Sequence, residues 1–453
     1  MSSTFRYWYA DGQHNAPRES GWTRISQRHY KETDRAWDVP GFTAGPAEPP
    51  SWSADLLRCA RAVYLADKLS RRSKADDGWT RTIHLSVPVV DPELWTSQAC
   101  PVLERLLRTA TGDMWAMEFH RATGDDVPNP AFYAGGCRSG EVTLFSGGLD
   151  SLSWALRRVS DGSRDALHLV TFNDAPLKSC QEAALRLVCH EKRRGRTIRR
   201  TVLPQELRER DPELRERDPL EGRLEVSSRT RGFLYAVAGL HVAAVNELPT
   251  VEVPENGQVA FNPPLSPARA GACSTRSVHP WTLHLLNQLI SAVGGSVRVE
   301  NPLWRETKGG VCAAIREAGV TPSEAALSVS CGRSPVHYGR SDVAHCGCCF
   351  PCLIRRSGLL HAYGCDATEY RRNPWDLPLP SQRRENEPTE DWRALSRWLR
   401  APFTAADVAA DLPLPPGWSP QHLHNVIAAG RGELSRLPQL PPGRHHLPEP
   451  HGV

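Results

Sequence analysis

The chain has 453 residues, of which 40% are hydrophobic and 23% are charged. This composition is typical of folded globular proteins and excludes a disordered tail protein and a collagen-like fibre. The 55 basic and 51 acidic residues give a formal net charge of +4, which is too small to indicate a nucleic-acid or membrane partner by itself. At roughly 150 residues per domain, the length predicts about three domains.

The sequence contains no apolar stretch of the roughly 18 residues that a membrane-spanning helix needs. Its start, MSSTFRYWYADGQ, lacks the basic segment and the apolar run of a secretory signal, so we expect a cytoplasmic protein. Five of the 13 cysteines fall between Cys331 and Cys352. In a reducing compartment such a cluster indicates metal binding rather than disulfide bonds.

An N-terminal α/β domain is expected over residues 1–138. After a polar start, apolar residues at helical spacing predict an amphipathic helix over 54–72, with Ser53 as its N-cap. The alternation of apolar and polar residues over 80–90 then predicts a strand, and Pro88 indicates an edge strand or the end of one.

A second domain is expected over residues 139–365. Strands and helices alternate in its first part, with strands at 141–145, 167–172 and 197–202 and helices at 150–158 and 179–189. This alternation predicts an α/β fold with a doubly wound parallel sheet. The apolar segment 232–246 is interpreted as a buried core helix.

Residues 366–453 are expected to form a small helical extension. A linker-like segment comes first, and helical patterns follow near 392–399 and 422–434. The proline- and histidine-rich tail from Pro438 is expected to be disordered.

A glycine-rich turn lies between the first strand and the first helix of the second domain, and reads Ser146-Gly147-Gly148-Leu149-Asp150-Ser151. Such a turn presents backbone N–H groups and a helix N-terminus to an anion, although a plain glycine turn is the alternative. The chain has no GxxxxGK[ST] motif, which disfavours transfer of the γ-phosphate by a Walker-type site. The turn resembles the pyrophosphate-binding loop of the PP-loop ATP pyrophosphatases, which split ATP between its α and β phosphates.

The cysteine cluster predicts a closed zinc site. Overlapping CxxC pairs join Cys346, Cys349 and Cys352, and Cys331 completes a set of four thiolates. Four protein ligands leave no coordination position for water, so the Zn²⁺ is expected to be structural. Cys348 falls between the ligands and is interpreted as a spectator.

The two motifs in this order resemble the QueC family, the 7-cyano-7-deazaguanine synthases. That family has SGGxDS near its start and a C…CGxCxxC segment, followed by an arginine-bearing helix, near its end. Two intervening segments are also similar, the arginine-bearing entry to an apolar helix at 228–234 and a Pro-x-x-x-x-Thr-Lys segment at 302–308. The resemblance covers residues 141–363, about half of the chain.

The resemblance implies a set of site residues for ATP, Mg²⁺ and a deazaguanine. The residues implied to hold ATP are Ser146, Gly147, Gly148, Leu149, Asp150, Ser151 and Arg229. Asp150 is the candidate contact for Mg²⁺, and Lys308 would neutralise charge at the α-phosphate. The candidate contacts to the substrate are Glu255, Asn256, Arg276 and Thr307. For the lysine and the arginines a solvated position is the alternative, and for Glu255-Asn256 a plain turn.

The chain also departs from the family. Phe172 leads to Asn173-Asp174 where the family has a Tyr-Gly-Gln-type segment, Gly310 replaces an acidic residue, and the two outer domains have no counterpart in the housekeeping enzyme. Extended QueC-like proteins occur in the Qat and type IV CBASS anti-phage systems, in which the chemistry stops at an amide with a partner protein's N-terminal amine.

We therefore expect an ATP-dependent ligase that adenylates 7-carboxy-7-deazaguanine and joins it to a partner protein. The first alternative is a nitrile synthase that uses ammonia. The second is a tRNA-modifying PP-loop enzyme, against which the weak net charge and the cysteine pattern count. A scaffold without activity is the third, and the intact glycine turn counts against it.

Overall fold

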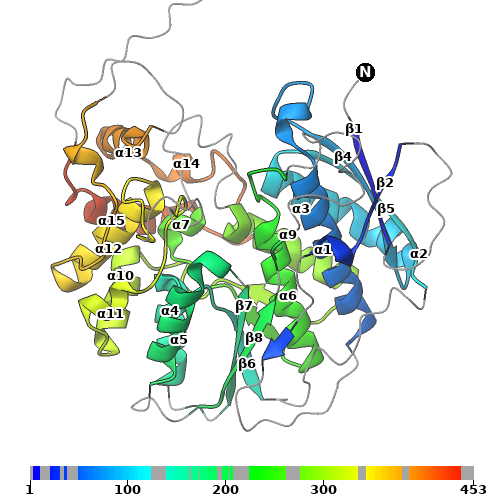
Figure 1. The fold of residues 1–453 in the computed structure, drawn as a ribbon, viewed down its shortest axis with the longest axis horizontal. Helices are drawn as coiled ribbons and strands as arrows, with labels where there is room; N and C mark the ends of the chain where they lie inside the picture. Colours follow the sequence, from blue (N-terminus) through cyan, green and yellow to red (C-terminus); the bar gives the residue numbers. More distant parts are fainter. Residues whose placement is uncertain are drawn as a thin grey trace, which may run out of the picture.

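Two β-sheets of mainly parallel strands organise the chain in the computed structural model (Figure 1). The residues that the structure describes are 4–10, 21–30, 35–37, 49–123, 139–161, 163, 165–172, 174–190, 196–203, 205–207, 224–261, 276–334, 343–379 and 387–439. The segment 45–48 and the tail 440–453, for which a linker and disorder are expected, lie outside these residues. The fold is α/β, as the sequence predicts.

The first sheet is four-stranded, with the order β2-β1-β4-β5 and parallel pairing throughout. Its strands are β1 (Thr4–Tyr9), β2 (Thr23–Ile25), β4 (Thr82–Val89) and β5 (Met114–Arg121). The helices that precede β4 and β5 are α1 (Ser51–Leu69), α2 (Pro92–Leu94) and α3 (Cys100–Thr111). The expected helix and strand of the N-terminal region are thus present, and β4 is an internal strand whose Pro88 lies near its end.

The start of α1 differs from its prediction. Its N-cap is Pro50, three residues before Ser53. The Ser53 hydroxyl lies 3.0 Å from the Pro50 carbonyl, to which it donates, and 3.1 Å from His241 Nδ1. Ser53 therefore joins α1 to the buried His241 of α6 instead of capping the N-terminus of α1.

The second sheet is six-stranded, with the order β10-β9-β6-β7-β8-β3. Its strands are β3 (Arg35–Trp37), β6 (Gly140–Leu144), β7 (Ala166–Phe172), β8 (Ile198–Leu203), β9 (Thr250–Glu252) and β10 (Arg298–Glu300). All pairs are parallel except that of β3 with β8. The sheet is therefore doubly wound as predicted, and it also takes an edge strand from the N-terminal region.

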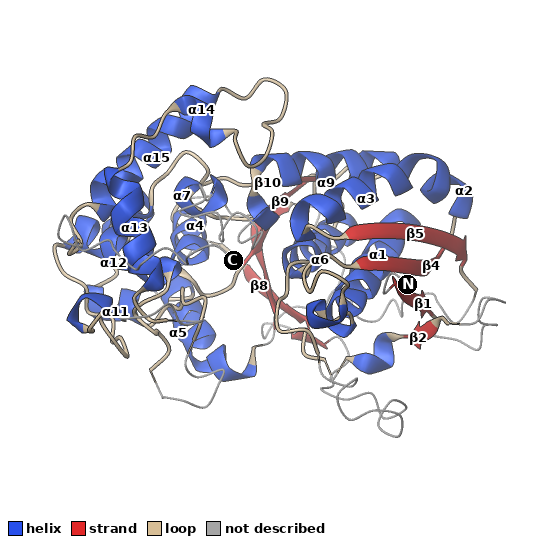
Figure 2. Ribbon diagram, turned by 90° about the horizontal axis from the view of Figure 1, so that it is seen from above, coloured by secondary structure: helices blue, strands red, loops and turns tan. Residues whose placement is uncertain are grey.

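Helices cover both faces of the second sheet. One face carries α4 (Leu149–Val159), α5 (Lys178–Val188) and α10 (Lys308–Glu317), and the other carries α6 (Arg231–Val245) and α9 (Pro280–Ala292). Helices α1 and α3 of the first sheet pack on α6 and α9, so that four helices lie between the two sheets (Figure 1). Figure 2 shows the first sheet and the C-terminal helices on opposite sides of this centre.

The remaining helices gather around the end of the chain. They are α7 (Gly257–Phe261), α11 (Pro322–Ala326), α12 (Phe350–Tyr363), α13 (Glu390–Arg400), α14 (Ala405–Val408) and α15 (Pro420–Leu434). Two small apolar clusters join α13 to α12 and α15 to α7. The two C-terminal helices predicted from the sequence are α13 and α15. None of the described helices combines the length and apolar character needed to cross a bilayer.

Candidate functional site

The turn between β6 and α4 is fixed by its own glycines and serines. Gly147 has a φ of 78°, and a Cβ at this position would lie 3.0 Å from the Cα of Gln181. Ser146 Oγ accepts the N–H of Gly148 (3.3 Å), and Ser151 Oγ donates to the Gly148 carbonyl (3.1 Å). Gly148 is the N-cap of α4 and has no side chain to cover the first turn. The turn therefore offers backbone N–H groups and the positive end of a helix dipole, which suit a phosphate group.

The acidic residue of this turn meets the predicted lysine. Asp150 Oδ2 forms a buried ion pair with Nζ of Lys308, the first residue of α10. Asp150 Oδ1 accepts two hydrogen bonds from Asn256, one from the backbone N–H (3.1 Å) and one from Nδ2 (2.9 Å). Burial opposes the charge of Lys308, but the carboxylates of Asp150 and Glu255 outweigh it and raise the pKa of Lys308. Lys308 is therefore held as a cation beside the glycine turn.

Glu255 adds a second carboxyl group next to this ion pair. Its Oε1 accepts a hydrogen bond from Asn256 Nδ2 (3.2 Å), and its N–H donates to Asn301 Oδ1 (3.1 Å). Burial, followed by the negative charge of Asp150, raises the pKa of Glu255 from 4.5 to about 8, and Lys308 partly opposes this shift. A carboxyl group with such a pKa gains and loses a proton near neutral pH, as a general acid or base must.

These residues meet where the strand order of the second sheet reverses. β6 lies between β7 on one side and β9 on the other. Asp150 follows β6, and Glu255 and Asn256 follow β9. Open α/β sheets bind ligands in the crevice at the carboxyl ends of the strands at such a point. Asp150, Glu255 and Asn256 therefore occupy the place in the fold where a ligand is expected.

A cavity of about 240 Å³ lies beside the glycine turn, at the carboxyl ends of β6, β7 and β8. Ser146 and Gly147 contribute to its lining, together with Arg231. The rings of Phe172 and Tyr235, whose centroids are 3.7 Å apart, also line it. Aromatic rings beside an anion-binding turn suit a nucleotide. A larger cavity of about 1150 Å³ lies at the opposite end of α4, and its lining contains none of the predicted site residues.

Arg229 lies away from this cavity. Its guanidinium donates to the Thr111 carbonyl and lies 4.8 Å from the ring centre of Trp79, both in the N-terminal region. Arg231, two residues later, is the arginine that lines the cavity. The sequence pattern pointed to Arg229, and it did not distinguish this arginine from Arg231 at the same helix start.

Two other predicted residues have structural contacts elsewhere. Arg276 donates to the Thr109 carbonyl (3.2 Å) and pairs with Asp411 (2.7 Å), which connects the N-terminal region to the C-terminal extension. The side chain of Leu149 is fully buried in the apolar cluster of α4, α5 and α10. Only the backbone of Leu149 is therefore available to a phosphate, and Arg276 bonds to the N-terminal region and to the C-terminal extension.

Thr307 caps α10 and contacts the C-terminal helix α15. Its hydroxyl accepts the N–H of Gly310 (3.1 Å) and donates to Glu433, which also accepts the N–H of Gly309 (2.9 Å). The resemblance places an acidic residue at position 310. Here the carboxylate at the start of α10 comes from Glu433 instead. Sequence reasoning missed Glu433 because no pattern relates it to a turn that lies 126 residues earlier.

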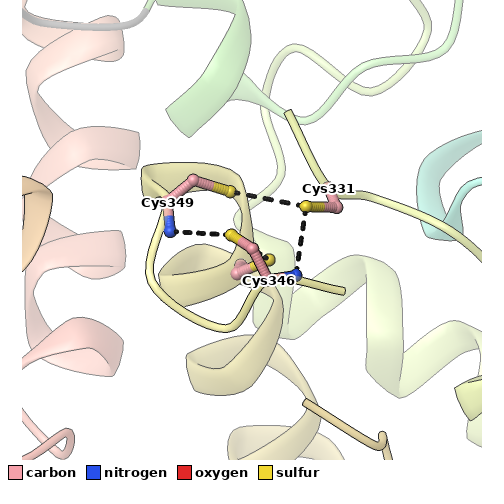
Figure 3. Close-up of side chains that lie close together, drawn as sticks. Cys331, Cys346 and Cys349 are labelled. Atoms are coloured by element: carbon pink, nitrogen blue, oxygen red, sulfur yellow. Dashed lines mark hydrogen bonds between the residues drawn. The ribbon is translucent and has the colours of Figure 1, made fainter. Parts of the chain in front are cut away.

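The four predicted metal ligands come together, and Figure 3 shows three of them, Cys331, Cys346 and Cys349. The Sγ atoms of Cys331, Cys346, Cys349 and Cys352 all lie within 4.8 Å of one another. The backbone N–H of Cys346 donates to Cys331 Sγ (3.4 Å), and that of Cys349 donates to Cys346 Sγ (3.3 Å). Such bonds stabilise thiolates, and four thiolates at this spacing are compatible with a zinc ion.

Cys348 lies outside this group. Its Sγ is 3.9 Å from the Arg372 carbonyl, and burial raises its pKa to about 11, so it stays a thiol. The pKa of Cys346, in contrast, is lowered by hydrogen bonds from the other three cysteines, first of all Cys331. The geometry thus separates the spectator from the ligands as the spacing predicts.

The cysteine segment is tied to the glycine turn. The N–H of Val329 donates to the Gly147 carbonyl (3.3 Å), and Cys331 contributes to the lining of the 240 Å³ cavity. The buried guanidinium of Arg355 on α12 donates to Ser328 Oγ (2.9 Å) and to the Ala325 carbonyl (2.9 Å). A metal bound by the cysteines would therefore fix one wall of the cavity.

No protein-family model matches this chain, and no curated protein has a matching sequence.

Proposed function

We propose that the chain is an ATP-dependent ligase of the PP-loop type, which forms AMP and pyrophosphate. The observation that carries this proposal is the turn Ser146–Ser151, whose first two residues line a cavity together with aromatic rings and whose Asp150 is paired with Lys308. The position of this group at the switch point of a doubly wound sheet supports it further.

The residues present suit ATP and Mg²⁺. The backbone of the turn would hold the pyrophosphate, and Asp150 supplies the carboxylate oxygens that Mg²⁺ prefers. Lys308 would neutralise charge that develops at the α-phosphate. The bound Mg²⁺ would screen the phosphate charges, and Phe172 and Tyr235 offer apolar surface to the nucleoside.

We assign zinc to the four cysteines, because a closed set of four thiolates is typical of structural zinc sites. Its role would be to hold the segment that bears Val329 and Cys331 against the glycine turn.

The substrate follows from the resemblance to the QueC family, and is 7-carboxy-7-deazaguanine. Its carboxylate oxygen would attack the α-phosphate and release pyrophosphate. The nitrogen of an amine would then attack the activated carbonyl carbon, the bond from that carbon to the AMP oxygen would break, and AMP would leave as an anion. Glu255, whose pKa is raised to about 8, would accept the proton that the nitrogen loses.

The acceptor we propose is the N-terminal amine of a partner protein, as in the extended anti-phage systems. The two outer regions support this choice, because both contact the segments that carry the site. Thr111 of the first region holds Arg229, and Glu433 of the last holds the turn before α10. Ammonia as the acceptor, followed by dehydration to the nitrile, is the alternative outcome of the test.

The first experiment tests adenylation alone. With ATP, Mg²⁺ and 7-carboxy-7-deazaguanine, the protein should exchange labelled pyrophosphate into ATP, and Asp150→Asn should abolish the exchange. The matched control is Asp165→Asn, which changes an exposed carboxylate just before the amino end of β7, whereas Asp150 follows the carboxyl end of β6. This variant should be active. Release of ADP as the only nucleotide product would exclude the mechanism.

The second experiment identifies the acceptor. Incubation with candidate partner proteins, ATP and the carboxylate should add the mass of one deazaguanine, linked through an amide, to one partner's N-terminal peptide. Efficient nitrile formation from ammonia with every partner unmodified would assign the protein to the small-molecule synthases.

A further inference from the structure

The C-terminal helix α15 lies against the residues that carry the catalytic lysine. It packs on α7, on α12 and on the start of α10. Figure 1 shows α15 beside α10 and α12, on the side of the molecule away from the first sheet. A helix from the far end of the chain is therefore part of the surroundings of Lys308.

Glu433 of α15 holds both neighbours of Lys308. One carboxylate oxygen accepts the hydroxyl of Thr307, and the other accepts the N–H of Gly309 at 2.9 Å. Glu433 is 5% exposed. The site also excludes any larger residue at 309, because a Cβ there would lie 2.3 Å from Glu433 Oε1.

A second contact, from Gln258 of the neighbouring helix α7, reaches the backbone of Lys308 itself. The Lys308 N–H donates to Gln258 Oε1 at 2.6 Å. Gln258 is packed against Gly430 of α15, where a Cβ would lie 2.1 Å from Gln258 Nε2. Glu433 of α15 therefore holds the hydroxyl of Thr307 and the backbone of Gly309 directly, and Gly430, one turn earlier on α15, packs on the Gln258 that holds the backbone of Lys308.

Burying Glu433 costs free energy that an apolar residue at the same position would not cost. Burying a carboxylate is unfavourable unless its oxygens are hydrogen-bonded, and apolar residues of the same size pack a helix at least as well. Both oxygens of Glu433 are used, and both are used at the turn that orients Lys308. Because Lys308 is the first residue of α10, the direction of its side chain depends on the backbone of this turn.

We propose that Glu433 is a positioning residue for Lys308, so that the C-terminal extension is an integral part of the catalytic centre. This inference rests on the proposed function for its kinetic consequence. It also has a structural consequence that does not depend on activity: loss of Glu433 should release Lys308 from its ion pair with Asp150.

The first test measures the release of Lys308 without using activity. Lys308 is one of six lysines, so acetylation by acetic anhydride followed by peptide mass spectrometry can report on it separately. Lys308 should be protected in the wild-type protein and should react at least about tenfold faster in Glu433→Ala. Glu433→Gln keeps an acceptor for the Gly309 N–H and places an NH2 donor where the Thr307 hydroxyl can accept it, so this variant should restore the protection of Lys308.

The control variant is Leu395→Ala. Leu395 is fully buried in the cluster that joins α13 to α12 and to Leu434 of α15, so its loss lowers the melting temperature while it removes neither hydrogen bond of Glu433. If its melting temperature is as low as that of Glu433→Ala, Leu395→Ala should still leave Lys308 protected from acetylation. Equal labelling of Lys308 in both variants would mean that Glu433 acts only through stability, and would overturn the proposal.

The second test is kinetic. In pyrophosphate exchange, Glu433→Ala should lower kcat by about tenfold or more, since misplacement of a catalytic group by about 1 Å costs on that order, while the KM for ATP changes little. Glu433→Gln should recover most of the rate. If the wild-type protein shows no exchange, the proposed function fails and the labelling result still decides the role of Glu433. If exchange is normal in Glu433→Ala and Lys308 stays protected, the positioning role is wrong.

Discussion

Cys348 and Cys349 are adjacent in the sequence, but only Cys349 belongs to the candidate metal site. Cys349 belongs to the group of four Sγ atoms, whereas Cys348 faces the Arg372 carbonyl. We expect Cys349→Ser to reduce the zinc content to below one per chain and to lower the melting temperature, because ligand loss removes metal-binding free energy from folding. Cys348→Ser should leave both unchanged. Metal analysis and thermal melts check this, and the reverse ranking would show that the ligands are assigned wrongly.

The raised pKa of Glu255 predicts how amide formation depends on pH. A base must be ionised to act, so the single-turnover rate of amide formation should rise with pH, with a midpoint near 8, and should level off above it. The groups that face Glu255 are Asp150, which raises this pKa, and Lys308, which lowers it. Glu255→Gln should lose the rise and slow the step about 100-fold or more.

An N-terminal amine titrates in the same pH range, so the acceptor needs a control. Hydroxylamine is a weaker base that is already neutral at lower pH, and with it the rise near 8 should persist in the wild-type protein. Pyrophosphate exchange, which involves no amine, should lack the rise. If the midpoint of the rate moved to the pKa of each acceptor amine, Glu255 would not be the base.

At the scale of the elements, local patterns predicted most of what surrounds the site. The strands and helices from 141 to 202 alternate as β6, α4, β7, α5 and β8, because buried parallel strands are apolar runs with clear turn signals. The glycine turn, Asp150, Lys308 and the four cysteines were found for the same reason, since each sits in a short motif. Contacts between distant segments were not foreseen, because β3 joins β8 and Glu433 joins α10 without any local signature.

The glycine turn itself supports a prediction with an internal control. Gly147 and Gly294 share a φ of 78°, but a Cβ at 147 would press on the backbone of Gln181, and at 294 it would meet nothing within 4 Å. Gly294→Ala should lower the free energy of unfolding by about 1 kcal/mol through backbone strain alone. Gly147→Ala should lower the free energy of unfolding by more than this and should abolish pyrophosphate exchange, because the turn must shift away from α5. Equal exchange rates in the two variants, measured beside denaturant melts, would argue against a phosphate-binding role for the turn.

On the scale of the whole molecule, the outer regions are continuous with the centre. One apolar cluster runs from Leu85 in the first sheet through Leu65 and Leu240 to Val142 in the second. Apolar packing is therefore continuous across the expected boundary at 138. The division into three domains stays a prediction, because it rests on length and length carries no information on which faces the parts of a chain share.

Polar contacts across the same boundary reach the start of α6. The buried carboxylate of Asp67 on α1 accepts the N–H (3.1 Å) and the hydroxyl (2.7 Å) of Thr230, the residue before Arg231. Asp67 also pairs with Arg81 at 2.6 Å. The first region thus fixes Thr230, the neighbour of the Arg231 that lines the cavity, so we expect its removal to affect the site as well as any surface for a partner.

These contacts predict one cooperative unfolding unit. Scanning calorimetry of the zinc-loaded protein should show a single transition with a van't Hoff enthalpy close to the calorimetric enthalpy, since a shared core cannot melt in halves. A chain that begins at residue 139 should fail to fold, because it loses β3 from the second sheet and exposes the faces of α6 and α9 that α1 and α3 cover. If that fragment were soluble and still exchanged pyrophosphate, the first region would be a separable accessory domain, and the roles of Asp67 and Thr230 in shaping the cavity would have to be abandoned.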